Sequence, residues 1–174
     1  MAAPKFSLIV KPNDWSKSLK TQTQAARSER SNMYRQLWGD LIEYLRNNFQ
    51  ELVLPNPSGM HWIRFPIPDS KIVLSYASTK QQISFYVLFR GEKPIDWYQH
   101  IQSDSERIED EIGRSLDWRE EEDGSGYIFL SMVFNHSDQN SYKGKFAEIG
   151  DTIKRITNSI EKRYSQLQNL EEMK

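Results

Sequence analysis

One short stretch, Pro68-Asp69-Ser70-Lys71, contains the residue types of a metal-dependent nuclease. Such nucleases use two separate acidic positions on neighbouring strands, one of them in an Asp/Glu-x-Lys pair, to hold Mg²⁺ and activate water. Here Asp69 would have to fill both positions, and it follows a proline between two strand-like runs, where a turn itself favours Asp. The stretch therefore favours a turn, and a Mg²⁺-dependent nuclease using Asp69 and Lys71 is kept as the enzymatic alternative.

Other reactive residue types do not form a catalytic pattern. The chain has no cysteine, which excludes disulfides, thiol nucleophiles and zinc–thiolate sites. His61, His100 and His136 fall in three different segments without metal-ligand spacing, and Glu120 to Asp123 lack the spacing of a calcium loop. The acidic run is predicted to be a solvated hairpin tip. We therefore expect no catalytic residue, no metal site and no cofactor.

Basic residues are concentrated near the start of the chain. The net charge is −1, yet residues 1–50 carry eight Lys/Arg against four Asp/Glu, while residues 92–123 carry four against twelve. A local excess of positive charge can bind phosphates, so direct nucleic-acid binding is a second alternative. The residues expected to make those contacts are Lys17, Lys20, Arg27, Arg30 and Arg35.

Aromatic and basic residues also share the strand-like runs. A sheet with exposed rings and flanking bases can stack single-stranded bases. The alternation of apolar residues more strongly favours a core covered by helices for most of these rings. The rings are Trp62, Tyr76, Phe85, Tyr86, Phe89, Tyr127 and Phe129, and the bases are Arg64, Lys71, Lys80 and Arg90.

The elements that position these residues follow from periodicity. Apolar residues spaced by three and four predict helices over residues 34–49, 94–112 and from about 142 onward. Runs at 60–65, 71–76 and 82–90, separated by short turns, predict an antiparallel meander, and strands from 116 and over 127–134 follow.

These elements predict an α+β fold with one antiparallel sheet of about five strands and helices packed mainly on one face, in the order helix, three strands, helix, two strands, helix. Residues 32–174 are expected to form this single domain, with a long C-terminal helix. Residues 16–31 are predicted to be a polar linker or helix. The expected core residues are Trp38, Leu41, Leu45, Phe85, Val87, Phe89, Ile101, Ile108, Leu116 and Trp118.

The last helix is expected to be longer than the sheet beneath it. It would measure about 46 Å at 1.5 Å per residue, whereas five strands are about 24 Å across at 4.8 Å spacing. Its last turns, which carry Tyr164, Leu167 and Leu170, therefore need another partner. We consider residues 19–30 of the same chain and, alternatively, the same helix of a second copy in a weak homodimer.

Three stretches resemble a known family: PNDW at 12–15, MYRQLWGDL at 33–41 and RIEDEIGRSLDW at 107–118. They resemble an uncharacterised prokaryotic domain family, found C-terminal to predicted PD-(D/E)XK-like restriction nuclease domains, over about residues 30–165. The resemblance brings no established catalytic residues. It implies that residues 1–15, with the strand-like Phe6 to Val10, are the final strand and exit turn of an upstream domain, or else an N-terminal arm.

The resemblance also implies a function. We expect a non-catalytic accessory or interaction domain of a DNA-processing, restriction-nuclease-like protein, with an upstream nuclease-like domain and DNA as its partners. No apolar run approaches the roughly 20 residues that span a bilayer, so no membrane partner is expected. A cytoplasmic location is expected.

Overall fold

The computed structural model describes residues 14–138 and 142–172. Its centre is one antiparallel sheet with the strand order β1-β2-β3-β5-β4. The strands are β1 (Trp62–Ile67), β2 (Ser70–Ala77), β3 (Gln82–Phe89), β4 (Asp117–Glu120) and β5 (Gly126–Val133). The helices are α1 (Asp14–Asn48), α2 (Pro94–Gln102), α3 (Ser105–Ile112) and α4 (Tyr142–Glu172). The predicted α+β fold with a five-stranded antiparallel sheet is confirmed.

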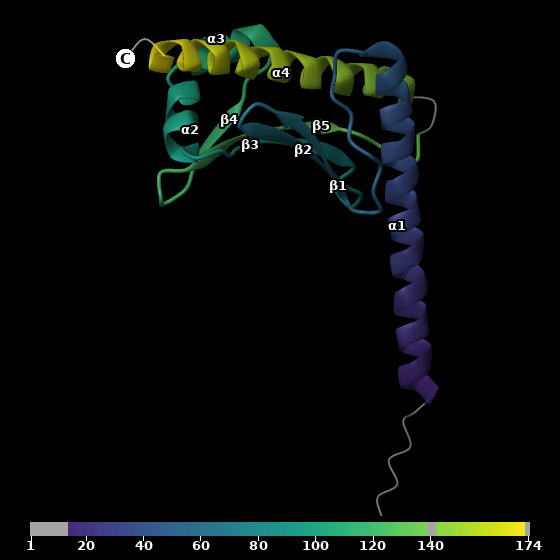
Figure 1. Cartoon of the computed structure of the whole chain (residues 1–174). Helices are drawn as coiled ribbons and strands as arrows, with labels where there is room; N and C mark the ends of the chain where they lie inside the picture. Colours follow the sequence, from purple (N-terminus) through teal and green to yellow (C-terminus); the bar gives the residue numbers. More distant parts are fainter. Residues whose placement is uncertain (1–13, 139–141, 173–174) are drawn as a thin grey trace, which may run out of the picture.

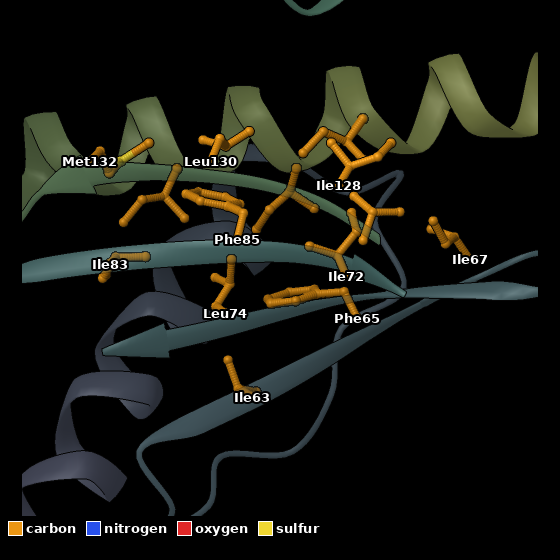
Figure 2. Packing of buried hydrophobic residues seen from close by; sticks show 14 of the residues in the cluster. Ile63, Phe65, Ile67, Ile72, Leu74, Ile83, Phe85, Ile128, Leu130 and Met132 are labelled. Carbon is orange, nitrogen blue, oxygen red and sulfur yellow. The ribbon is translucent and has the colours of Figure 1, made fainter. Parts of the chain in front are cut away.

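Strict alternation along the strands gives the sheet two different faces. The inner face carries the buried aliphatic and aromatic residues, and Figure 2 shows labelled members pointing toward α4. α4 crosses over this face, α2 and α3 lie at one end of it, and α1 stands at the other (Figure 1). The inner-face residues include Ile63, Phe65, Ile72, Leu74, Tyr76, Ile83, Phe85, Val87, Ile128, Leu130 and Met132.

All the predicted core residues are buried except one. Trp38 is fully buried, and its indole N–H donates to the Met60 carbonyl at 2.8 Å, which anchors α1 to the start of β1. Trp118 is only partly buried because it lies on β4, the short edge strand. Its indole N–H donates to the Glu109 carboxylate at 3.0 Å. Trp97 was not predicted to be core, yet it is buried and donates to the Ser70 hydroxyl at 2.9 Å.

The helix predicted over residues 94–112 is two helices instead of one. α2 ends at Gln102 and α3 begins at Ser105, with Asp104 between them in a non-helical conformation. The Asp104 carboxylate does not cap α3 but binds the Arg163 guanidinium of α4, at 2.5 and 2.8 Å. The break between α2 and α3 is therefore accompanied by a contact between residues 59 positions apart, and local periodicity did not reveal it.

α1 is a single 35-residue helix that includes residues 16–31. Its end packs against α4 at Gly150, where a Cβ atom would lie 2.4 Å from Phe49 and 2.7 Å from Leu45. Tyr34 lies at the level of the sheet, with its ring 6.4 Å from that of Tyr76. Residues 14–30, called the arm below, extend past the sheet on the side away from α4 (Figure 1), and residues 21–30 are exposed.

The predicted opening strand, residues 6–10, lies outside the described residues. Asp14 and Trp15, which were expected in its exit turn, belong to α1 instead.

The later turns of α4 are covered by α2 and α3. Arg163 has a side-chain exposure of only 3% and pairs with Asp104 and Glu111, while the Tyr164 ring lies 5.7 Å from that of Trp97. These turns therefore do not pack on residues 19–30, which are in α1 at the opposite end of α4, and that intramolecular alternative was wrong. The weak homodimer stays a prediction.

Candidate functional site

The side of the sheet opposite the helices is called the open face here, because no described helix covers it (Figure 1). The strand register arranges its side chains in rows across the sheet. One row runs Arg64, Val73, Tyr86, Phe129 and Asp117, and the next runs Pro66, Lys71, Leu88, Tyr127 and Arg119. A third row, called the serine row, consists of Trp62, Ser75, Ser84 and Ser131.

Aromatic rings occupy the centre of the open face. Tyr86 and Phe129 are direct cross-strand partners with ring centroids 5.1 Å apart, and the Tyr127 ring is 6.1 Å from Tyr86. All three are half-buried. The strands hold them side by side because successive residues of one parity project from the same face.

Cations surround these rings. The Arg119 guanidinium lies 4.8 Å from the centroid of Phe129, and the Arg64 guanidinium lies 4.1 Å from that of Trp62. Burial, followed by the positive charges of Arg90 and Arg64, lowers the pKa of Lys71. Burial is the larger cause, and the two arginines add a secondary contribution of positive charge around Lys71.

Acidic groups on the open face are few and already engaged. Asp117 faces outward from β4, and its carboxylate accepts two hydrogen bonds from the Arg119 guanidinium, at 2.6 and 2.8 Å. Within the described part of the chain, Arg64, Lys71 and Arg90 form no ion pair. Their positive charge is therefore available to a ligand.

The arm presents further basic residues. Arg27 and Arg30 are exposed, and each precedes a buried residue, Tyr34 and Leu37, by seven positions. Seven residues are about two helical turns, so both arginines continue the side of α1 that packs on the sheet. Arg35 is exposed one turn nearer the sheet and donates to the Asn32 side chain at 3.3 Å.

The other two predicted contacts, Lys17 and Lys20, lie in α1, with side chains outside the described part. All five basic residues that the sequence singled out thus lie on α1, four of them in the arm and Arg35 just beyond it.

The two residues of the nuclease alternative, Asp69 and Lys71, lie in the turn after β1 and at the start of β2. Asp69 has a φ of 45° in the turn between β1 and β2, and its carbonyl accepts the Arg90 N–H at 2.6 Å. Lys71 belongs to the open face. In the parts of the chain that the structure describes, no three His, Asp or Glu side chains are grouped to hold a metal ion.

The other candidate groups have local partners. In the acidic turn, Asp123 accepts from the Ser125 N–H and hydroxyl, and these bonds lower its pKa. His61 lies near Tyr34 and His136 near Tyr76, so these two imidazoles flank the same pair of tyrosines. His100 stacks on Trp97 instead.

The open face was only partly anticipated. Tyr76, Phe85 and Phe89 lie in the covered core, as predicted. Trp62, Tyr86, Tyr127 and Phe129 face the other way and are half-buried, so placing most of the rings in the core was wrong for these four. A signal for this was present in β5, which puts both of its rings and its serine at one parity and no ring at the other, whereas β3 carries rings at both parities.

No helix among the described residues combines the length and the apolar character of a bilayer span.

Comparison with known proteins bears on the part of the chain that forms the sheet and its covering helices. A family model described as a domain of unknown function, DUF4268, matches residues 33–167. No curated protein and no solved structure matches the chain. The match includes all five strands and the open face, and it begins after the arm. Because it spans more than half of the chain, this protein belongs to the DUF4268 family.

Proposed function

We propose that the chain is a non-catalytic accessory domain of a DNA-processing, restriction-nuclease-like protein, and that it acts by contacting DNA. The sequence resemblance described above supports the DNA-processing context. The observation that carries the DNA contact is the arm, a projecting helical segment whose exposed arginines lie on one side.

The described part of the arm has little packing of its own to stabilise it. A polar helix of this length is only marginally stable in water without a partner, and residues 21–30 contribute no buried side chain. Phosphates are suitable partners for Arg27, Arg30 and Arg35, because a guanidinium forms strong, charge-assisted hydrogen bonds to phosphate oxygens. Such contacts read the backbone and not the base sequence, which suits an accessory role.

The test is a salt titration of binding to a short labelled DNA duplex. The variant Arg27→Gln/Arg30→Gln/Arg35→Gln should bind at least about tenfold more weakly at low salt, and its log K against log salt slope should fall by up to about 2.7, or about 0.9 per phosphate contact. The matched control, Arg46→Gln/Lys93→Gln/Arg107→Gln, removes the same charge from exposed positions off the arm and should bind like the wild type.

Equal weakening by both triple variants would reject a specific role of the arm. The enzymatic alternative is examined with plasmid DNA and Mg²⁺. Cleavage that disappears in Asp69→Ala and in Lys71→Ala would establish a nuclease and overturn the non-catalytic proposal.

A further inference from the structure

We infer that the open face binds single-stranded nucleic acid, with bases stacked on Tyr86 and Phe129 and phosphates held by Arg64, Lys71 and the arm. This inference rests on the proposed function, since it takes nucleic acid as the partner. It adds a second surface and a preference for unpaired strands.

The rings provide the stacking surface. Tyr86 and Phe129 lie opposite each other on β3 and β5, at the middle of a five-stranded sheet, and each keeps part of its surface in solvent. Every base has a flat π-surface, so ring stacking tolerates any sequence. A base inside a duplex is already stacked on its neighbours, so only an unpaired base is free to lie on these rings.

The arginines over the rings are compatible with this role. Arg119 covers Phe129 and Arg64 covers Trp62, and both guanidinium groups are exposed. An exposed cation–π pair is weak, so an incoming base displaces the guanidinium at little cost. The displaced group is then placed beside the base, where it can pair with the phosphate of the same nucleotide.

The distribution of charge along the open face indicates the direction in which a bound single strand would run. The arm stands at the end of the sheet where β2 ends at Ala77, and the acidic turn at 120–123 lies at the opposite end, beyond Tyr127. A polyanion is repelled from the acidic turn and attracted toward the arm. The strand is therefore expected to run from the rings across the serine row toward Arg30 and Arg27.

The serine row makes this path open. Between the rings and the arm the open face carries small side chains that protrude little from the sheet, namely Ser75, Ser84 and Ser131. Arg27 and Arg30 lie on the side of α1 that faces the sheet further along the helix. A single strand that leaves the rings thus meets small hydroxyl side chains first, then the row of Ala77, Gln82 and Val133, and then the arm arginines.

A protein partner is less well matched to this surface. Aromatic residues and arginine are common in protein interfaces as well. However, a protein partner would need a complementary excess of acidic side chains for Arg64, Lys71 and Arg90, whereas nucleic acid supplies one negative charge with every nucleotide. The unpaired positive charge beside the tilted rings of Tyr86 and Phe129 therefore favours nucleic acid.

The test uses fluorescence anisotropy with labelled oligo-dT, oligo-U and a DNA duplex. The key variant is Tyr86→Leu/Phe129→Leu, which keeps apolar bulk on the face, and hence the fold, but removes both flat rings. The wild type should prefer single strands, and the variant should lose about tenfold or more of its single-strand affinity while its duplex affinity is unchanged. Comparing oligo-dT with oligo-U shows whether the protein prefers single-stranded DNA or single-stranded RNA.

Two controls complete the design. Tyr44→Leu removes a half-buried ring that packs on Phe146 of α4, away from the open face, and should leave all affinities unchanged. Lys71→Gln/Arg64→Gln keeps Tyr86 and Phe129 and should reduce the salt dependence of single-strand binding.

Several results would overturn the inference. These are absence of single-strand binding, a preference for the duplex, single-strand affinity that survives the loss of both rings, and a dimer that Tyr86→Leu/Phe129→Leu dissociates. The two proposals fail separately. If the wild type shows no preference for single strands but its duplex binding still depends on the arm, only the inference about the open face is rejected. If duplex binding is the same in the wild type and in the arm variant, the role proposed for the arm is rejected.

Discussion

The two faces of the sheet are built from the same strands but differ in what covers them. On the inner face Phe85, Ile72 and Leu74 are fully buried beneath the helices. On the open face, Tyr86 and Phe129 keep part of their surface in water, and an arginine side chain lies over Phe129. The residues directly before and after them along the same strands are buried. Burial of the inner face accounts for stability, so the rings of the open face are free to serve binding. The predictions below test this division.

The largest expected effect comes from removing a ring on each face in turn. Phe85→Ala should lower the free energy of unfolding by about 4 kcal/mol, because it leaves a cavity in a packed core. Phe129→Ala should lower it by only about 1 kcal/mol, since water already reaches this ring. Urea unfolding followed by circular dichroism measures both values. Similar losses for the two variants would mean that the open face is as important for stability as the core.

The next effect contrasts a buried and an exposed arginine. Arg163→Ala should cost about 3 kcal/mol, because it removes the buried guanidinium that links the Asp104 and Glu111 carboxylates and leaves them only their more exposed partners, Arg107 and Lys162. Arg119→Ala on the open face should cost less than about 1 kcal/mol, since its pair with Asp117 is exposed on both sides. Thermal unfolding of the two variants ranks them. A larger loss of stability in Arg119→Ala than in Arg163→Ala would contradict the division between the two faces.

A third effect is a pH dependence that arises on the helical side, at Glu111. Hydrogen bonding from Arg163 lowers the pKa of Glu111 from 4.5 to about 2. Because the folded state holds this carboxylate ionised, its contribution is complete above the unfolded pKa and is lost as the pH falls from about 4.5 to about 2. In unfolding experiments across this range, Glu111→Gln should therefore be less stable at neutral pH and decline less steeply in acid. Parallel curves for the variant and the wild type would contradict the assignment.

Much of this division was predictable from local sequence. Spacings of three and four predicted the packed half of α1, and alternation predicted the buried side of β3, including core residues such as Val87. These patterns succeed because each helix and strand must bury one side. The basic residues of the arm were also identified from the sequence, since their concentration is a property of one segment.

What could not be predicted depends on contacts between distant segments. The break between α2 and α3 accompanies a contact of Asp104 with Arg163, and the cover of α4's later turns comes from Trp97 in α2. The open face required the pairing of β3 with β5, because only that register brings Tyr86 beside Phe129. Periodicity assigns a ring to one side of a strand but does not say whether a helix covers that side.

The contact at Gly150 has a mechanical consequence. α1 is held near its end, where a Cβ atom at position 150 would lie closer than 3.0 Å to the side chains of Leu45 and Phe49, and again near Tyr34. The arm extends about 26 Å beyond these supports at 1.5 Å per residue, so it acts as a lever with its pivot in the core. A tilt of about 5° at the pivot moves the tip by about 2 Å. Small changes in helix packing over the inner face are thus amplified into movement of the arm on the other side of the sheet.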